Sequence, residues 1–403
     1  MTRGSTPDAP LGKRDDGRLR GGFGLVLSGG AARGAYEAGV LRFVLRDLAR
    51  RLGRPTWPDV VSGTSVGALN GVFAASRNTL ALDRLCQVWR ELAVQDVYQF
   101  KLGHAVGHVL RDFWRPGRRA IGVEALIDPQ PFAALLTREF PEAALRRAID
   151  RGETRAFMVA ATEVHTGFNA VFVDTRDVLP LPFQVGSRVH PTHITGRHCQ
   201  ASAAIPFVFP PVDIAGRHYV DGGLRQNTPL RPVISTGVDR VLLIGLQVDR
   251  EQESRQNAML PSSRPSLVFL AGKMLDALML DPVERDLWSA QNKNAIMAWG
   301  RERFGDVFAD AAERELGLRE VEIVHLRPSL DLGRLAGETY RRKPPKTTRQ
   351  NRMLLDFVAS ATGDIEADAL SFLYFDREYT GALEALGYED AQRSEDRLAL
   401  LFS

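Results

Sequence analysis

The chain has 403 residues, of which 44% are hydrophobic and 25% are charged. These fractions are typical of globular proteins and exclude wholesale disorder, collagen-like repeats and coiled coil, and the length predicts one large domain or two of roughly 100 to 200 residues each. The 52 Lys and Arg residues against 49 Asp and Glu residues leave a net charge of only +3, so bulk charge gives no support for binding to nucleic acid.

The N-terminal segment, residues 1–22, carries charges on both sides of a Gly/Pro/Ser-rich stretch and has no apolar core of the length that a signal peptide requires. It is predicted to be a disordered tail. The two cysteines, Cys86 and Cys199, lie far apart and outside any CxxC spacing, which excludes a disulfide framework and a zinc cluster. With no run of 18 apolar residues, we expect a cytoplasmic protein without a transmembrane helix; the oligomeric state is left open.

Two strand-turn-helix units follow the tail in quick succession. In the first, an apolar run at residues 23–28 precedes a small-residue turn at 29–34 and a helical pattern at 35–52. In the second, a brief strand at 58–62 precedes the turn at 63–67, after which a helix begins. Two such units in series predict an α/β fold with a mostly parallel sheet flanked by helices.

The rest of the chain divides by pattern. Residues 80–151 are irregularly helical and are predicted to form a cap or insert, and buried strands are predicted at 155–164, 169–173 and 240–248. We expect the sheet to end near residue 250, which makes 23–250 one α/β domain. A polar, Pro/Ser-rich linker is predicted at 251–265, and a mostly helical C-terminal region at 266–403, with one further strand at 321–326.

Gly63-Thr64-Ser65-Val66-Gly67 matches the pattern G-x-S-x-G at the junction of a short strand and a helix. Glycines two residues to either side allow the sharp turn that presents a nucleophilic serine. The helix N-terminus nearby favours developing negative charge. A serine that only caps the helix remains the alternative interpretation.

A serine nucleophile needs a base, and the sequence offers two candidates. An ordinary α/β-hydrolase triad would need a late histidine, and only His325 lies far downstream, inside a predicted strand rather than after one. The stronger candidate is Asp221, which ends a short predicted strand and precedes two glycines that permit close approach to another loop. Burial would raise the pKa of this carboxyl and make it a better base. A plain Asp-Gly hairpin turn is the alternative.

Four blocks in this order resemble the patatin-like phospholipase family. They are LSGGAARGAYEAGVL (27–41), GTSVGALNG (63–71), ASAAIPFVFPPV (201–212) and YVDGGLRQNTP (219–229). The resemblance implies a patatin-like three-layer sandwich and a lipid acyl hydrolase with a Ser–Asp dyad and no cofactor. It makes Ser65 the nucleophile, Asp221 the general base, and the N–H groups of the glycine-rich turn the oxyanion hole. The implied oxyanion donors are Gly29, Gly30 and Ala31, and the implied supporting residues are Arg33, Gly34, Gly63, Gly67, Gly222 and Gly223.

The glycine-rich turn departs from the family pattern at one position. The family usually has G-G-G-x-[K/R]-G, whereas the third glycine here is Ala31. Alanine still supplies an N–H group, but a positive φ at this position would strain the turn and lower activity. Arg33 either steadies the turn, attracts an anionic substrate, or is simply solvated or salt-bridged.

The partner implied by the resemblance is a lipid or phospholipid, reached by peripheral contact with a membrane. Two segments are candidates for that contact, the apolar helix predicted at 266–280 and the basic loop at 341–346, although a packed core helix and a solvated loop are the simpler interpretations. The stretches 326–336 and 371–391 also resemble the tails of some bacterial patatin-like proteins, as a helical cap or as a regulatory or oligomerisation module. The rival functions are a Ser-His-Asp esterase or thioesterase and a catalytically weak lipid-binding protein.

Overall fold

The structure is a computed structural model that describes residues 21–100, 127–177, 179, 186–206, 208–248, 270, 272–273, 282–362 and 367–403. Several sequence expectations lie outside these residues. They are the N-terminal tail up to residue 20, the linker at 251–265, and most of the apolar helix at 266–280.

A mixed nine-stranded sheet forms the centre of the molecule. Its parallel part has the order β11-β10-β1-β2-β5, and β6, β7, β9 and β8 continue it beyond β5 with both parallel and antiparallel pairings. The strands are β1 (Phe23–Leu27), β2 (Val60–Thr64), β5 (Ala156–Glu163), β6 (Asn169–Asp174), β7 (Ser187–Pro191), β8 (Val212–Ile214), β9 (Arg217–Asp221), β10 (Arg240–Ile244) and β11 (Glu322–Leu326). The α/β fold and the strands predicted near β1, β2, β5, β6, β10 and β11 are confirmed.

The sequence suggested that the sheet ends near residue 250, but it continues beyond that point. Strand β11, from the C-terminal region, pairs in parallel with β10 along its full length, and its Val324 and Leu326 are buried. These side chains extend the apolar core beyond β10. The sheet therefore contains strands from before and after the expected boundary at residue 250.

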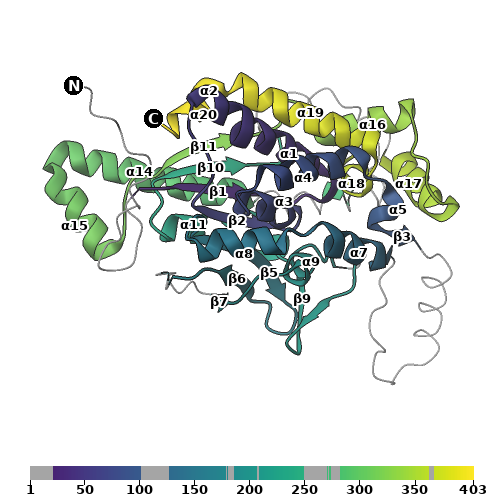
Figure 1. Cartoon of the computed structure of the whole chain (residues 1–403), viewed down its shortest axis with the longest axis horizontal. Helices are drawn as coiled ribbons and strands as arrows, with labels where there is room; N and C mark the ends of the chain where they lie inside the picture. The colour runs from purple at the N-terminus through teal and green to yellow at the C-terminus, as the bar shows by residue number, and fades with distance from the viewer. Residues whose placement is uncertain are drawn as a thin grey trace.

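Helices cover both faces of the sheet, in three layers. Alternation along β1 shows this division, because Leu25 and Leu27 belong to one core cluster and Val26 to the other. On the first face lie α1 (Ala35–Arg42), α3 (Val66–Ala75), α4 (Thr79–Glu91) and α19 (Arg377–Arg393), with α19 packed along α1 (Figure 1). On the second lie α11 (Leu230–Ser235) and α14 (Pro282–Phe304).

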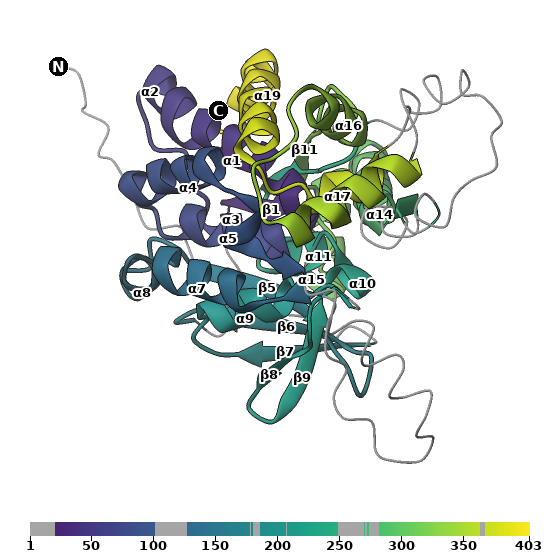
Figure 2. The same cartoon turned by 90° about the vertical axis from the view of Figure 1, so that its right-hand side faces the viewer.

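Short helices and loops surround the carboxyl ends of the strands. Figure 2 shows α5 beside α3, with α7 and α9 below them, and α17 to the right of the β1 label. The other elements are η1 (Ala31–Gly34), η2 (Phe43–Leu48), α2 (Ala49–Leu52), α5 (Val94–Val97), β3 (Gln99–Phe100), β4 (Ile127–Asp128), α7 (Gln130–Glu139), α8 (Glu142–Asp150), α9 (Gly196–Ser202), α10 (Gly223–Gln226), α15 (Asp306–Leu316), α16 (Leu332–Arg342), α17 (Arg349–Thr362), α18 (Asp368–Leu373) and α20 (Glu395–Leu400).

Polar side chains begin several of these helices. Asn78 accepts hydrogen bonds from two backbone N–H groups at the start of α4, and Asp331 and Asp376 do the same for one N–H group each in α16 and α19. Such caps satisfy donors that have no partner within the helix, and each contributes about 1 kcal/mol. None of the helices in the described ranges is long and apolar enough to cross a membrane.

Candidate active site

Ser65 occupies a sharp turn between β2 and α3. Its backbone has φ 55° and ψ −125°, a conformation that few residues other than glycine adopt, and the residue is only 2% exposed. A Cβ atom at Gly63 would lie 2.4 Å from the Gly67 carbonyl carbon, and one at Gly67 would lie 2.5 Å from the Leu27 carbonyl oxygen. The turn therefore requires glycine at both positions, as the G-x-S-x-G spacing suggested.

Ser202 at the end of α9 fixes the backbone of this turn. The Ser65 N–H group donates to Ser202 Oγ at 2.8 Å, and Ser202 Oγ donates to the Ala160 carbonyl on β5 at 2.5 Å. The strained conformation of Ser65 is thus held by a short relay to the neighbouring strand. The sequence contained this serine in the block ASAAIPFVF but gave no local signal of its role.

Asp221 ends β9 and is fully buried. Its Oδ1 accepts a hydrogen bond from the Gly223 N–H group at 2.7 Å, while Oδ2 accepts none from any residue that the structure describes. Burial raises the pKa of Asp221 to about 7, although the Gly223 N–H group and the Ser65 hydroxyl each lower it in part. A Cβ atom at Gly222 would lie 2.3 Å from the Ala160 carbonyl oxygen, so close approach explains the glycine after the aspartate.

Asn227 binds both backbone groups of Gly29. Its Oδ1 accepts from the Gly29 N–H group at 3.0 Å, and its Nδ2 donates to the Gly29 carbonyl at 3.2 Å. A Cβ atom at Gly29 would lie only 2.3 Å from Asn227 Oδ1. The next residue, Thr228, shares a hydrogen bond of 3.0 Å with the Ser28 hydroxyl. The Gly29 N–H group is therefore engaged, although the sequence suggested it as an oxyanion donor.

Gly30 and Ala31 differ from Gly29 in this respect. Within the described part of the chain, neither N–H group donates to another protein group. Ala31 has φ 51°, so this alanine adopts the left-handed conformation that the sequence analysis identified as a source of strain. That conformation costs an alanine roughly 1 to 2 kcal/mol. Gly34 is also tightly placed, because a Cβ atom there would lie 2.2 Å from a methyl group of Val66.

Arg33 is neither solvated nor open to a substrate. It is 3% exposed, and its guanidinium binds Asp368 and Ser371 of the C-terminal helix α18. The interpretation of Arg33 as a salt-bridged residue therefore describes the structure best.

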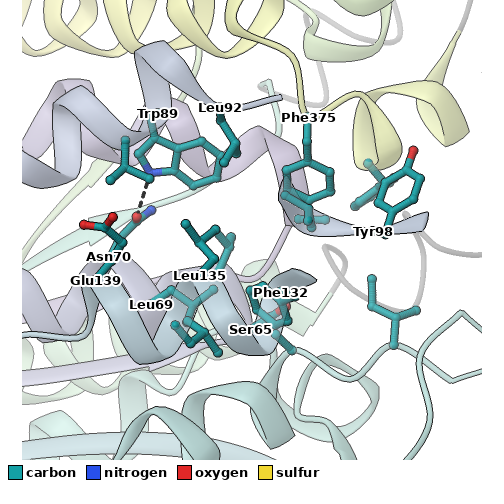
Figure 3. Close-up of a pocket in the computed structure, with 18 of the residues that line it drawn as sticks. Ser65, Leu69, Asn70, Trp89, Leu92, Tyr98, Phe132, Leu135, Glu139 and Phe375 are labelled. Atoms are coloured by element: carbon teal, nitrogen blue, oxygen red, sulfur yellow. Dashed lines mark hydrogen bonds between the residues drawn. The ribbon is translucent and has the colours of Figure 1, made fainter. Parts of the chain in front are cut away.

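A cavity of about 100 Å³ extends from Ser65 among α3, α4, α5, α7 and α18 (Figure 3). Its walls are almost entirely apolar. Ala31 of the glycine-rich turn lines the cavity together with Ser65, and the other lining residues include Leu69, Trp89, Leu92, Tyr98, Phe132, Leu135, Phe209, Phe372, Leu373 and Phe375. An apolar pocket that ends at a serine hydroxyl suits an aliphatic chain attached to a reactive carbonyl.

Asn70 is one of the few polar groups on this wall, and all its hydrogen-bonding capacity is directed into the protein. Its Nδ2 donates to the Gly34 carbonyl and to Glu37 Oε2, each at 2.8 Å, and its Oδ1 accepts from Trp89 Nε1 at 3.0 Å (Figure 3). Burial raises the pKa of Glu37 well above its ordinary value. The network joins α1, α3 and α4 behind the glycine-rich turn and leaves the cavity apolar.

His325, the base of the rival triad, lies far from Ser65. It belongs to β11, and the sheet order places β10 and β1 between that strand and β2, a separation of about 14 Å at about 4.8 Å per strand spacing. Burial lowers the pKa of His325 to about 3, with a further contribution from Arg327. This histidine is a neutral, half-buried residue of β11 rather than a partner of Ser65.

The basic loop at 341–346 packs against the C-terminal helices. Lys343 forms an ion pair with Glu378 at 2.6 Å, and its carbonyl accepts a hydrogen bond from the Tyr374 hydroxyl at 3.1 Å. Part of the loop's charge is thus used within the protein.

Comparisons with known proteins show what this chain is similar to. A family model described as patatin-like phospholipase matches residues 25–234, just over half of the chain. Lysophospholipase NTE1 from two strains of Cryptococcus neoformans var. neoformans serotype D, JEC21 and B-3501A, is 24% identical over 231 residues, which cover 55% of this chain and 11% of the fungal protein. The chain therefore spans about a tenth of the length of these curated relatives.

Solved structures were also found to be similar. VipD from Legionella pneumophila has a TM-score of 0.37 and 12% identity, with 98% of this chain and 72% of that chain covered. Human GIVD cytosolic phospholipase A2 in complex with methyl gamma-linolenyl fluorophosphonate has a TM-score of 0.39 and 13% identity, with 95% and 59% covered. On the extent of the family match, this chain belongs to the patatin-like phospholipase family.

Proposed function

We propose that this protein is a serine lipid acyl hydrolase of phospholipase A type that uses Ser65 as nucleophile and Asp221 as general base. The observation that carries the proposal is the placement of both residues. Ser65, in its strained conformation, lines an apolar cavity, and the buried carboxyl of Asp221, with a pKa of about 7, lies close enough to the Ser65 hydroxyl for that hydroxyl to lower the pKa in part. A carboxyl with this pKa can accept a proton near neutral pH, whereas an ordinary aspartate is a weak base.

The first step forms an acyl-enzyme. Asp221 accepts the hydroxyl proton of Ser65 while the serine oxygen attacks the acyl carbonyl, whose oxygen becomes negatively charged. The N–H groups of Gly30 and Ala31 are the proposed donors to this oxyanion, because Gly29 already binds Asn227. Removing one such donor typically costs roughly 3 to 4 kcal/mol of transition-state stabilisation. The intermediate collapses when the C–O bond to the leaving alcohol breaks and Asp221 returns the proton to that alcohol.

The second step reverses these roles with water. Asp221 takes a proton from water, the hydroxide attacks the acyl-serine, and the fatty acid leaves as Ser65 recovers its proton. The cavity holds the acyl chain in both steps and excludes bulk water around it. Because lipids of this kind reside in membranes and micelles, the proposal includes peripheral contact with a lipid surface. The position of His325 argues against the rival triad.

Replacement of the two proposed residues tests the chemistry. We expect Ser65→Ala and Asp221→Asn each to lower kcat/KM for a butyrate ester by at least about a thousandfold, because nucleophile and base act as a unit. Labelling by a fluorophosphonate should be lost in Ser65→Ala.

The matched control is Ser62→Ala in the same strand. Ser62 is fully buried, and its hydroxyl has no hydrogen-bond partner among the described residues, so its loss should leave activity unchanged. Full turnover by either dyad variant would refute the dyad. A folded wild type that hydrolyses no ester and resists the probe would instead favour a lipid-binding role. Products formed from a mixed lipid extract by wild type, but not by Ser65→Ala, would identify the lipid class.

A further inference from the structure

Arg33 connects the glycine-rich turn to a helix 335 residues later in the chain. Its Nε donates to Ser371 Oγ at 2.7 Å, and its Nη2 donates to Asp368 Oδ1 at 3.1 Å. The guanidinium carbon also lies 4.2 Å from the ring centre of Phe372. All three partners belong to α18, and the whole arrangement is buried. One short helix therefore holds the Arg33 side chain by an ion pair, by hydrogen bonds and by contact between the guanidinium and an aromatic ring.

The backbone of Arg33 carries this constraint to the proposed oxyanion donors. The Arg33 N–H group donates to the Gly30 carbonyl at 3.1 Å. In a planar trans peptide the carbonyl and the following N–H group point in opposite directions. Fixing the Gly30 carbonyl therefore fixes the direction of the Ala31 N–H group. Through Arg33 and Gly30, α18 thus acts on the direction of this N–H group.

We propose that Asp368 is a positioning residue for catalysis, which holds Arg33 so that the Ala31 N–H group is aimed at the oxyanion. The inference rests on the proposed function and deepens it, because it makes the C-terminal region part of the active site. Without the Asp368 carboxylate, α18 holds the buried guanidinium of Arg33 less firmly. The turn then loses part of the anchor that opposes the left-handed strain at Ala31.

The position of α18 on the cavity gives independent support. Phe372 and Leu373 of this helix, and Phe375 just after it, line the same cavity that reaches Ser65. The Leu373 carbonyl accepts a hydrogen bond from the hydroxyl of Tyr98, another residue that lines the cavity, at 2.9 Å. Asp368 also binds Lys273 at 3.0 Å, so the carboxylate is itself held in place.

The test compares kcat and KM for a butyrate ester in the full-length protein. We expect Asp368→Ala to lower kcat by roughly 10- to 100-fold, less than the loss of a whole oxyanion donor because the Ala31 N–H group is misaimed rather than removed, with KM changed less than about twofold. Asp368→Asn keeps an acceptor of the same size and should show an intermediate kcat. Arg33→Gln should match Asp368→Ala, and the double variant should be no slower than either, because both act through one contact.

Glu384→Ala is the matched control. Glu384 is also a buried carboxylate of the C-terminal region and pairs with Arg42 at 3.0 Å and Arg90 at 2.8 Å, but it does not bind the glycine-rich turn. We expect this variant to lower Tm and keep kcat within about twofold. The inference is overturned if folded Asp368→Ala and Asp368→Asn retain wild-type kcat, or if Glu384→Ala loses as much. Hydrolysis that survives Ser65→Ala would refute the proposed function instead.

Discussion

Ser65 and Ala31 both adopt positive φ angles without being glycine, and both line the cavity. Each such residue costs of order 1 to 3 kcal/mol. Hydrogen bonds from distant parts of the chain hold both turns, because Ser202 binds the Ser65 N–H group and Asn227 binds the backbone of Gly29, two residues before Ala31. At the scale of single residues, the site is a strained arrangement that a few specific hydrogen bonds maintain.

The raised pKa of Asp221 leads to a pH dependence with a definite sign. A general base must be ionised to accept a proton, so protonation of Asp221 below its pKa of about 7 should remove activity. We expect kcat/KM for a butyrate ester to rise about tenfold per pH unit up to about pH 7 and then to level off. The measurement is a pH–rate profile with the Ser65→Ala background subtracted at each pH.

An exposed aspartate would behave differently. Its pKa near 4 would leave the profile flat from about pH 5 upward. A flat profile in that range would show that Asp221 either is not the base or is better solvated than its complete burial indicates.

Short-range patterns were enough to predict Ser65 and Asp221 as candidates, because each lies in a motif whose turn geometry is local. Ser202 and Asn227 gave no such signal. Their contacts join residues 137 and 198 positions apart, and nothing in the neighbouring sequence distinguishes them from ordinary polar residues. The sequence also could not show that the Gly29 N–H group already has a partner, since only the fold brings Asn227 close enough to accept its hydrogen bond.

At the scale of elements, α3, α4 and α7 give the cavity its depth. Leu69 lies one turn after Ser65 on α3 and faces the cavity (Figure 3). We expect Leu69→Trp to fill the space next to the nucleophile and to lower kcat/KM for a palmitate ester at least about tenfold more than for a butyrate ester. A long chain must displace the new ring, whereas a short one need not. The ratio of the two rate constants is the measurement.

The same substitution at an exposed leucine controls for the added ring. Leu80 on α4 is 77% exposed and does not line the cavity, so Leu80→Trp should leave the palmitate-to-butyrate ratio unchanged. An unchanged ratio in Leu69→Trp would show that the acyl chain lies elsewhere.

Helices and strands with a strong periodic pattern of apolar residues could be predicted from the sequence. Those whose pattern is weak or interrupted could not. The buried run at 155–164 identified β5, but β7 has mostly exposed, polar residues and β8 has three residues, so neither carries a pattern. The helix expected over 35–52 is interrupted by the π-helical stretch Phe43–Leu48, whose apolar side chains stay buried in the core. Its residues are of the same types as in the flanking α-helix, so the sequence does not mark the change.

At the scale of the whole molecule, the α/β domain expected at 23–250 does not close its own sheet and core, because the C-terminal region completes both. Strand β11 covers β10, and α19 packs along α1. We expect a fragment of residues 1–250 to expose β10 as an unpaired edge, to aggregate or lack a cooperative thermal transition, and to hydrolyse no ester. Circular dichroism and size-exclusion chromatography would measure this, with co-expression of residues 251–403 as the rescue. A monomeric, active fragment would contradict it.

The contact between Arg33 and Asp368 also sets an order in time. The ribosome releases the glycine-rich turn early, and its anchor follows 335 residues later. At about 5 to 20 residues per second, that interval lasts about 20 to 70 seconds. If Asp368 positions the turn as proposed, a nascent chain that still lacks Asp368 would hydrolyse esters roughly 10- to 100-fold more slowly than the finished protein. Full activity would then appear only after the C-terminal region has been made and has folded.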